Sequence, residues 1–161
     1  SVLIQETPWV LEAQNEEQQK KNIALLFDML KLSSQSESSI SKLKDMQSSN
    51  GGFVWFKGGP DNRYITQYIV TGIGHLKKLN ALTSEQNEKL KSILNTALPY
   101  LDKMLKKDYD ELIKYKTKLK ENNLSIIAIQ YLYIHSFYHN YPIAKNNQTA
   151  FNYYSEQSKK Y

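Results

Sequence analysis

Two histidines, His135 and His139, are the clearest candidates for metal chemistry in this sequence, because they lie four residues apart. On a helix this spacing puts two imidazoles on one face, as in many zinc sites. The catalytic form of that motif needs a glutamate where Ser136 stands, and the sequence offers no evident third ligand. We therefore interpret both histidines as hydrogen-bonded structural residues and expect no metal site.

A second candidate is Gly72-Ile73-Gly74, which matches part of a dinucleotide-binding fingerprint. The segment lies inside a helical pattern, follows no predicted strand and has Lys77 in place of the third glycine. Small residues at these positions favour close approach of a neighbouring helix instead. We expect a packing role here and no bound cofactor.

Enzymatic chemistry has little support elsewhere in the chain. No Gly-x-Ser-x-Gly elbow or phosphate-binding loop is present, and no pair of carboxylates falls in a stretch that indicates a pocket. The absence of cysteine excludes disulfides, thiolate metal sites and thiol nucleophiles within these 161 residues. The sequence therefore predicts a protein that packs and binds and is not an enzyme, with no catalytic residue to name.

Charge and hydropathy restrict the partners. The formal net charge is +5, yet every basic residue except Arg63 is a lysine, which disfavours specific nucleic-acid recognition. No apolar run is long enough to span a membrane, so we expect no membrane insertion. Because Ser1 is neither an initiator methionine nor the start of a signal peptide, we expect the chain to be a piece of a longer protein.

Hydrophobic periodicity predicts an all-α domain covering residues 1–161, built from about six helices in three consecutive hairpins. Asp61 is the expected N-cap of the third helix, Thr83 and Gln86 form a capping box for the fourth, and Pro99 is expected to kink it. The fifth helix is apolar on nearly every side, which predicts a central helix surrounded by protein. The expected helices cover about residues 14–32, 34–46, 61–79, 83–118, 126–138 and 147–154.

Between the second and third helices, two glycine pairs and a proline over residues 50–60 predict an ordered loop with aromatic anchors. In the first interpretation the glycines turn the chain while Phe53, Trp55 and Phe56 wedge between hairpins. In the alternative, Trp55 and Arg63 line a ligand cavity. We favour the first.

Tyrosines concentrate in the last third of the chain, where they serve either a binding surface or a half-buried core. We favour core packing, with hydroxyls that reach solvent. The tyrosines concerned are Tyr131, Tyr133, Tyr138, Tyr141, Tyr153, Tyr154 and Tyr161.

The loop with its preceding glutamine, Gln47 followed by Asn50-Gly51-Gly52-Phe53, resembles turns that recur in α/α toroids. The whole chain, from about Leu3 to Tyr161, is similar to the later part of the thioester-containing helical domain of bacterial alpha-2-macroglobulins. The similarity weakens after Leu82. The segments that carry it are Glu6-Thr7-Pro8-Trp9, Leu25-Leu26-Phe27-Asp28, Asn50 to Phe56 with Gly58-Gly59, and Arg63 to Tyr68 running into Gly72 to Leu76.

This resemblance implies a partial α/α toroid from a large protease inhibitor that traps endopeptidases in the periplasm, the cell envelope or outside the cell. Its partners would be proteases, reached through the full-length protein, and other domains of the same chain. The family's thioester segment would precede Ser1, so no reactive residue is transferred to this chain. The rival interpretations are an α/α-toroid enzyme (a cyclase, prenyltransferase or carbohydrate-active enzyme) and a helical interaction scaffold.

Overall fold

The computed structural model describes residues 37–161, and these residues form an all-α fold apart from two strands of two residues each. This confirms the predicted fold class. The helix expected over residues 14–32, the start of the next one and the first two segments of the family resemblance lie outside the described residues. The elements are α4 (Glu37–Asp45), β1 (Phe53–Val54), β2 (Asp61–Asn62), α5 (Arg63–Lys78), α6 (Ser84–Lys114), α7 (Ile126–His135), a 3-10 turn (Lys145–Asn147) and α8 (Gln148–Lys160).

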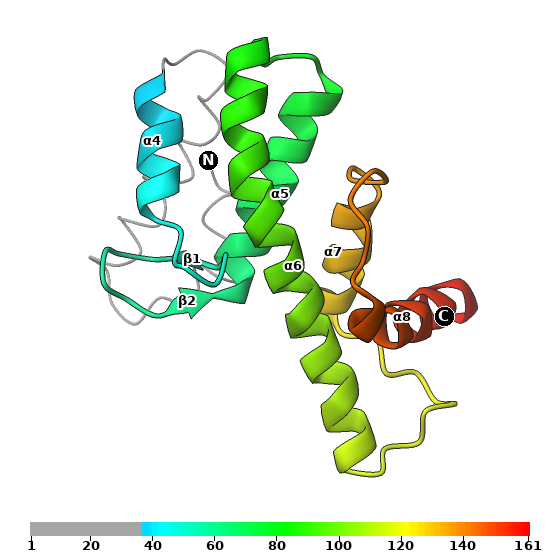
Figure 1. Ribbon diagram of the computed structural model, residues 1–161. Coiled ribbons are helices and arrows are strands. Elements are labelled where there is room, and N and C mark those ends of the chain that lie inside the picture. The colour runs from blue at the N-terminus through cyan, green and yellow to red at the C-terminus, as the bar shows by residue number, and fades with distance from the viewer. Residues whose placement is uncertain (1–36) are drawn as a thin grey trace, which may run out of the picture.

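Helices α5 and α6 form an antiparallel hairpin joined by a short connection (Figure 1). Their facing sides carry the predicted apolar seams, in which Ile65, Ile69 and Ile73 of α5 are fully buried. The seam of α6 is buried too, over Leu90, Ile93, Leu94, Ala97, Leu98, Leu101 and Leu105. Leu79 was expected in the α5 seam but is 74% exposed, because the helix ends at Lys78.

The capping box of α6 is confirmed. Thr83 Oγ1 accepts a hydrogen bond from the Gln86 amide at 3.1 Å, and the Gln86 side chain accepts one from the Thr83 amide at 3.0 Å. The helix continues through Pro99 and ends at Lys114, four residues before the predicted limit. The kink expected at Pro99 stays a prediction.

The predicted N-cap of α5 was wrong by one residue. Asn62 fills this position, and its Oδ1 accepts from the amides of Tyr64 at 2.9 Å and Ile65 at 3.2 Å. Asp61 pairs with Val54 in the two-stranded ladder, and its carboxylate accepts from the Tyr100 hydroxyl at 2.6 Å. The strand pairing therefore sets the helix start one residue later.

The prediction of a surrounded fifth helix was also wrong. Helix α6 is the central element among the described helices, since it contacts α4, α5, α7 and α8. Helix α7 buries Ala128, Tyr131 and Ile134, while Ile126, Ile129 and Tyr133 remain 71%, 50% and 51% exposed. An apolar pattern all round a helix fits both a buried helix and one with an uncovered face, and only the tertiary contacts separate the two.

The last helix begins after Asn147, one of the two residues, Asn146 or Asn147, that the sequence predicts as its cap, but without a side-chain cap. A 3-10 turn leads into α8, and the Asn147 side chain is buried and makes no capping hydrogen bond. Ala150 and Tyr154 are buried on its inner face, with Phe151 partly buried. Among residues 37–161, no helix has the length and apolar character needed to cross a bilayer.

Candidate functional site

The turn after α4 is held against α6 by the side chain of Gln47. Its Nε2 lies 3.0 Å from the carbonyl oxygens of both Gly51 and Ile93 and 2.9 Å from Thr96 Oγ1. Gly51 has a φ of +96°, and a Cβ built there would overlap the carbonyl group of Thr96. The Gln-x-x-Asn-Gly-Gly motif therefore lets the backbone of the turn lie directly on the backbone of α6.

The aromatic residues of this loop behave unequally. Phe53 is fully buried and Trp55 is 9% exposed, so both anchor the loop in the core as expected. Phe56, however, is 44% exposed. Its ring lies over Gly59, where a Cβ would come within 3.0 Å of it, so Phe56 covers the loop tip and does not wedge between helices.

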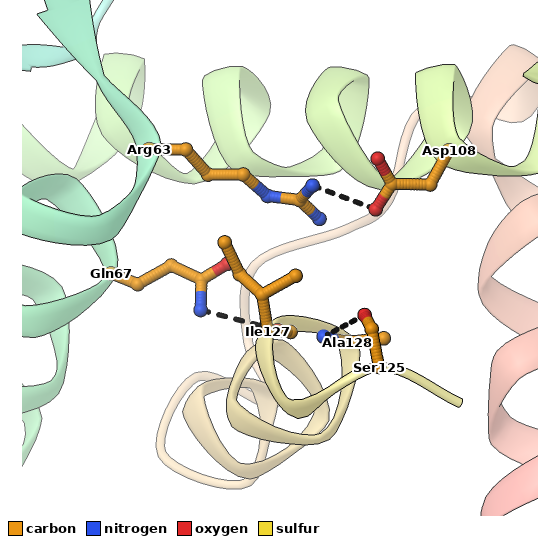
Figure 2. Close-up of polar contacts among 6 residues, drawn as sticks. All are labelled: Arg63, Gln67, Asp108, Ser125, Ile127 and Ala128. Atoms are coloured by element: carbon orange, nitrogen blue, oxygen red, sulfur yellow. Dashed lines mark hydrogen bonds and ion pairs between the residues drawn. The ribbon is translucent and has the colours of Figure 1, made fainter. Parts of the chain in front are cut away.

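Arg63 joins α5 to α6 through a half-buried ion pair. Its Nη1 donates to Asp108 Oδ2 at 2.7 Å, and the side chains of Arg63 and Asp108 are 14% and 30% exposed (Figure 2). Burial raises the pKa of the Asp108 carboxyl above its ordinary value, although the Arg63 guanidinium opposes this shift. One turn further along α5, Gln67 Nε2 donates to the carbonyl of Ile127 in α7 at 3.2 Å.

Three buried polar atoms near this ion pair have no hydrogen-bond partner in the described structure: Arg63 Nε, Arg63 Nη2 and Gln67 Oε1. The Nε and Nη2 groups form the edge of a guanidinium that binds carboxylates in a bidentate manner. Arg63 lines a cavity of about 510 Å³ together with Asp108, Glu111 and Tyr154. Since Asp108 already pairs with the single guanidinium and Glu111 lines the same cavity, the local charge disfavours an additional anion.

The alternative interpretation from the sequence, a cavity lined by Trp55 and Arg63, agrees with the structure only in part. Arg63 lines the cavity, whereas Trp55 is not among its lining residues. The residues that do surround it come from α5, α6, the loop between α6 and α7, the first turn of α7, and α8. They include Ser125, whose Oγ caps α7 by accepting from the Ala128 amide at 3.1 Å. What the geometry supports best is a polar junction between helices.

His135 and His139 do not share a helical face, because α7 ends at His135. His135 Nε2 lies 3.3 Å from Asp102 Oδ1, an oxygen that also accepts from the Tyr131 hydroxyl at 2.6 Å. His139 is exposed, and both imidazoles line a cavity of about 540 Å³ between α7 and α8. No group of three potential metal-binding side chains was found among the described residues.

Asp102 is the residue in this cluster that the sequence did not single out. It is only 5% exposed and lies on the apolar seam of α6, four residues after Leu98. A carboxylate on a buried helical face requires hydrogen-bond donors. An aspartate on the predicted apolar seam was therefore the signal in the sequence that could have identified this site. Tyr131 supplies one donor and His135 Nε2 lies 3.3 Å from the same oxygen, so His135 is hydrogen-bonded, as predicted.

The packing role predicted for the glycine pair is confirmed at Gly74. A Cβ at Gly74 would lie 2.8 Å from Cγ of Phe137, the second residue beyond the end of α7. The absence of a side chain here lets this ring lie directly on α5.

The C-terminal tyrosines behave unequally: Tyr133 and Tyr161 are 51% and 55% exposed, whereas the hydroxyls of Tyr131 and Tyr138 are bonded inside the core and not to solvent as expected. Tyr131, Tyr138 and Tyr154 are at most 3% exposed. The Tyr131 hydroxyl donates to Asp102, and that of Tyr138 donates to the carbonyl of Val70 at 2.6 Å. Burial is the main cause that raises the pKa of all three phenols above the ordinary value.

These shifts predict alkaline unfolding. Because the folded pKa values are raised, the folded state retains protons that the unfolded chain releases above about pH 10. The tyrosine contribution to stability is complete below that pH and is lost as the pH rises further. We expect the phenolate absorbance of Tyr131 and Tyr138 to appear together with the loss of helical circular dichroism. Ionisation of all twelve tyrosines in a chain that keeps its native spectrum would contradict this.

Searches with protein-family models, among curated proteins and among solved structures found no match to this chain.

Proposed function

We propose that this chain is part of an alpha-macroglobulin-like protease inhibitor, in which it belongs to the helical domain that carries the thioester in such proteins. The turn from Gln47 to Phe53 carries the proposal. Its motif resembles an α/α-toroid turn in sequence, and each of its distinctive residues has a contact that the turn requires: the Gln47 amide on α6, the Gly51 backbone against Thr96 and the buried Phe53 ring.

The segment Arg63 to Tyr68 gives further support. It is the strongest part of the family resemblance, and its side chains hold the start of α5 in place. The Thr66 hydroxyl accepts from the Phe53 amide at 2.8 Å and donates to the Asn62 carbonyl at 2.7 Å, which ties the loop to the helix. Arg63 and Gln67 bind the neighbouring helices.

In this proposal the chain is one domain that packs and binds, and it contributes no catalytic residue. The parent protein acts in the periplasm or cell envelope, or outside the cell, and its partners are proteases. This chain itself contacts other domains of the parent. A thioester, where the parent has one, lies before Ser1.

The decisive experiment uses the full-length protein encoded by the gene. After incubation with an endopeptidase, a trapping inhibitor suppresses cleavage of a large protein substrate while cleavage of a small peptide substrate continues, since the trapped protease keeps an open active site. We expect this difference for the full-length protein. Equal cleavage of the large substrate with and without it, across several proteases of different specificity, would overturn the proposal.

The isolated 161-residue chain provides the matched control. By itself, without the other domains of the parent, it is expected to inhibit no protease. Because it has no cysteine, it is also expected to incorporate no methylamine and to form no covalent adduct. Turnover of a polyprenyl or carbohydrate substrate by either protein would instead support the enzyme interpretation. The gene sequence just upstream of Ser1 shows whether a Cys-x-Glu-Gln segment is present, which separates a covalent trap from a steric one.

A further inference from the structure

Helix α7 presents an uncovered apolar face to solvent, which we call the α7 face and define as Ile126, Ile129 and Tyr133. These residues are spaced three and four apart, so they line one side of the helix. Their exposed fractions are 71%, 50% and 51%. Single exposed apolar residues are common, whereas three on one helical stripe form a patch of the kind that marks an interaction surface.

The α7 face continues into a cavity. Tyr133 packs edge-on against Phe137, with ring centroids 5.1 Å apart, and lies 6.2 Å from the ring of His75 on α5. Tyr133 and Phe137 line a cavity of about 440 Å³ whose other walls include Gly74, Lys77 and Lys78. Gly74 has no side chain, and a Cβ there would lie 2.8 Å from Cγ of Phe137. A protruding side chain of a protein partner can fill such a concavity.

The charge around this face is one-sided. Over their full lengths, α5 and α7 contain no aspartate or glutamate, while α4, α6 and α8 all do. Lys77 and Lys78 lie at the end of α5 beside the cavity and form no ion pair within residues 37–161. Lysines at a helix C-terminus commonly complement the helix dipole. Since Lys77 and Lys78 have no ion-pair partner among residues 37–161, their ammonium groups are available to an anion of a partner.

We propose that the α7 face and its adjoining cavity bind an amphipathic helical segment of a separate protein, whose apolar side lies on Ile126, Ile129 and Tyr133 and whose acidic residues pair with Lys77 and Lys78. A helix with apolar residues at matching intervals aligns with the stripe, and one large apolar side chain enters the cavity. The carboxylates supply the charge that α5 and α7 lack. This inference stands independently of the proposed function.

The test uses a synthetic helical peptide with leucines at helical spacing and glutamates flanking them, and a control peptide in which every glutamate is replaced by lysine. Fluorescence anisotropy with the 161-residue chain is expected to give a dissociation constant of about micromolar order for the glutamate peptide, weakening as salt is added. The lysine peptide is expected to bind at least about tenfold more weakly. Equal affinity for the two peptides would overturn the proposal.

Two residues with nearly equal exposure provide a matched pair of variants. Ile129 is 50% exposed on the α7 face, and Ile113 is 49% exposed near the far end of α6. Ile129→Glu is expected to raise the dissociation constant for the glutamate peptide by about tenfold or more, while Ile113→Glu is expected to leave this constant unchanged. Because both side chains are half in solvent, both variants are expected to fold, which thermal unfolding checks. Equal effects of the two variants would place the peptide elsewhere.

Charge reversal tests the lysines separately. The double variant Lys77→Glu with Lys78→Glu is expected to bind the lysine peptide more tightly than the glutamate peptide, which inverts the original preference. The neutral pair Lys77→Gln with Lys78→Gln is expected to bind both peptides about equally. A preference unchanged by reversal would show that these lysines do not read the charge of the partner and would overturn the assignment.

Other occupants of the face give different results. If the chain sedimented with vesicles of phosphatidylcholine and phosphatidylserine but bound neither peptide, and if Ile129→Glu abolished this sedimentation, the face would be assigned to membranes. A dimer in analytical ultracentrifugation that Ile129→Glu dissociates would assign it to a second copy. Peptide binding by this chain but not by the full-length protein would assign the face to another part of the same protein. Each of these results would overturn the proposal of a separate acidic partner.

Discussion

Replacing Gly51 by alanine is expected to lower the free energy of unfolding by about 4 kcal/mol. The new Cβ would overlap the carbonyl group of Thr96 and lie 3.1 Å from the amide nitrogen of Ala97. These are backbone atoms inside α6, so the clash cannot be relieved by rotating a side chain. The φ of +96° adds strain, since side-chain-bearing residues disfavour that region. Urea unfolding followed by circular dichroism measures the loss.

Gly58 provides a matched control in the same loop. Its φ is +84°, similar to that of Gly51, but a Cβ there would meet no atom within 4 Å. Gly58→Ala is therefore expected to cost only about 1 kcal/mol, the conformational part alone. If the two variants were equally destabilised, the close contact between the turn and α6 would have no energetic role. The family resemblance of this turn would then lack its physical explanation.

Replacing Tyr131 by alanine is expected to lower the free energy of unfolding by about 4–5 kcal/mol. Tyr131 is 1% exposed and is the largest of the fully buried side chains in the described structure. The substitution removes its ring from contact with His135 and Phe151 and removes the hydroxyl that donates to Asp102. Both the cavity and the weakened solvation of a buried carboxylate contribute to the loss.

Two further variants divide this effect. Tyr131→Phe keeps the ring and removes only the hydrogen bond. It is therefore expected to lower the free energy of unfolding by about 2 kcal/mol, near the value for a hydrogen bond to a charged acceptor. Tyr133→Ala, on the same helix but 51% exposed, is expected to cost no more than about 1 kcal/mol. A loss for Tyr131→Phe below about 0.5 kcal/mol would mean that the hydroxyl does not stabilise the buried carboxylate.

The candidate sites show how far residue types can lead. Arg63 was predictable as a special residue because it is the only arginine, and the structure does place it at a junction of helices. Its partner Asp108 was not predictable, since α6 carries Asp108, Asp110 and Glu111 within one turn and only the packing of α5 selects one of them. The same holds for Asp102, whose two donors come from α7, about thirty residues later.

The two histidines illustrate the limit of a spacing argument. Four residues separate them, yet the helix stops at His135 because the chain turns through tighter bonds, from the Phe137 amide to Ile134 and from the Tyr138 amide to His135. Pro142 gave a later stop signal in the sequence. Tyr138 is buried with its hydroxyl on Val70 of α5, so a tertiary contact accompanies the early end of the helix.

Features that depend on neighbours along the chain could be predicted from the residues alone. These are the all-α class, the buried seams of α5 and α6, the capping box at Thr83 and the turn at Gly51, and each follows from helical periodicity, local hydrogen bonding or backbone freedom. The packing of the helices settled three points that the residues left open: which apolar helix is central, which carboxylate pairs with Arg63 and which face of α7 is exposed to solvent. Burial and ion pairing depend on distances between segments far apart in the chain, and no local sequence pattern specifies those distances.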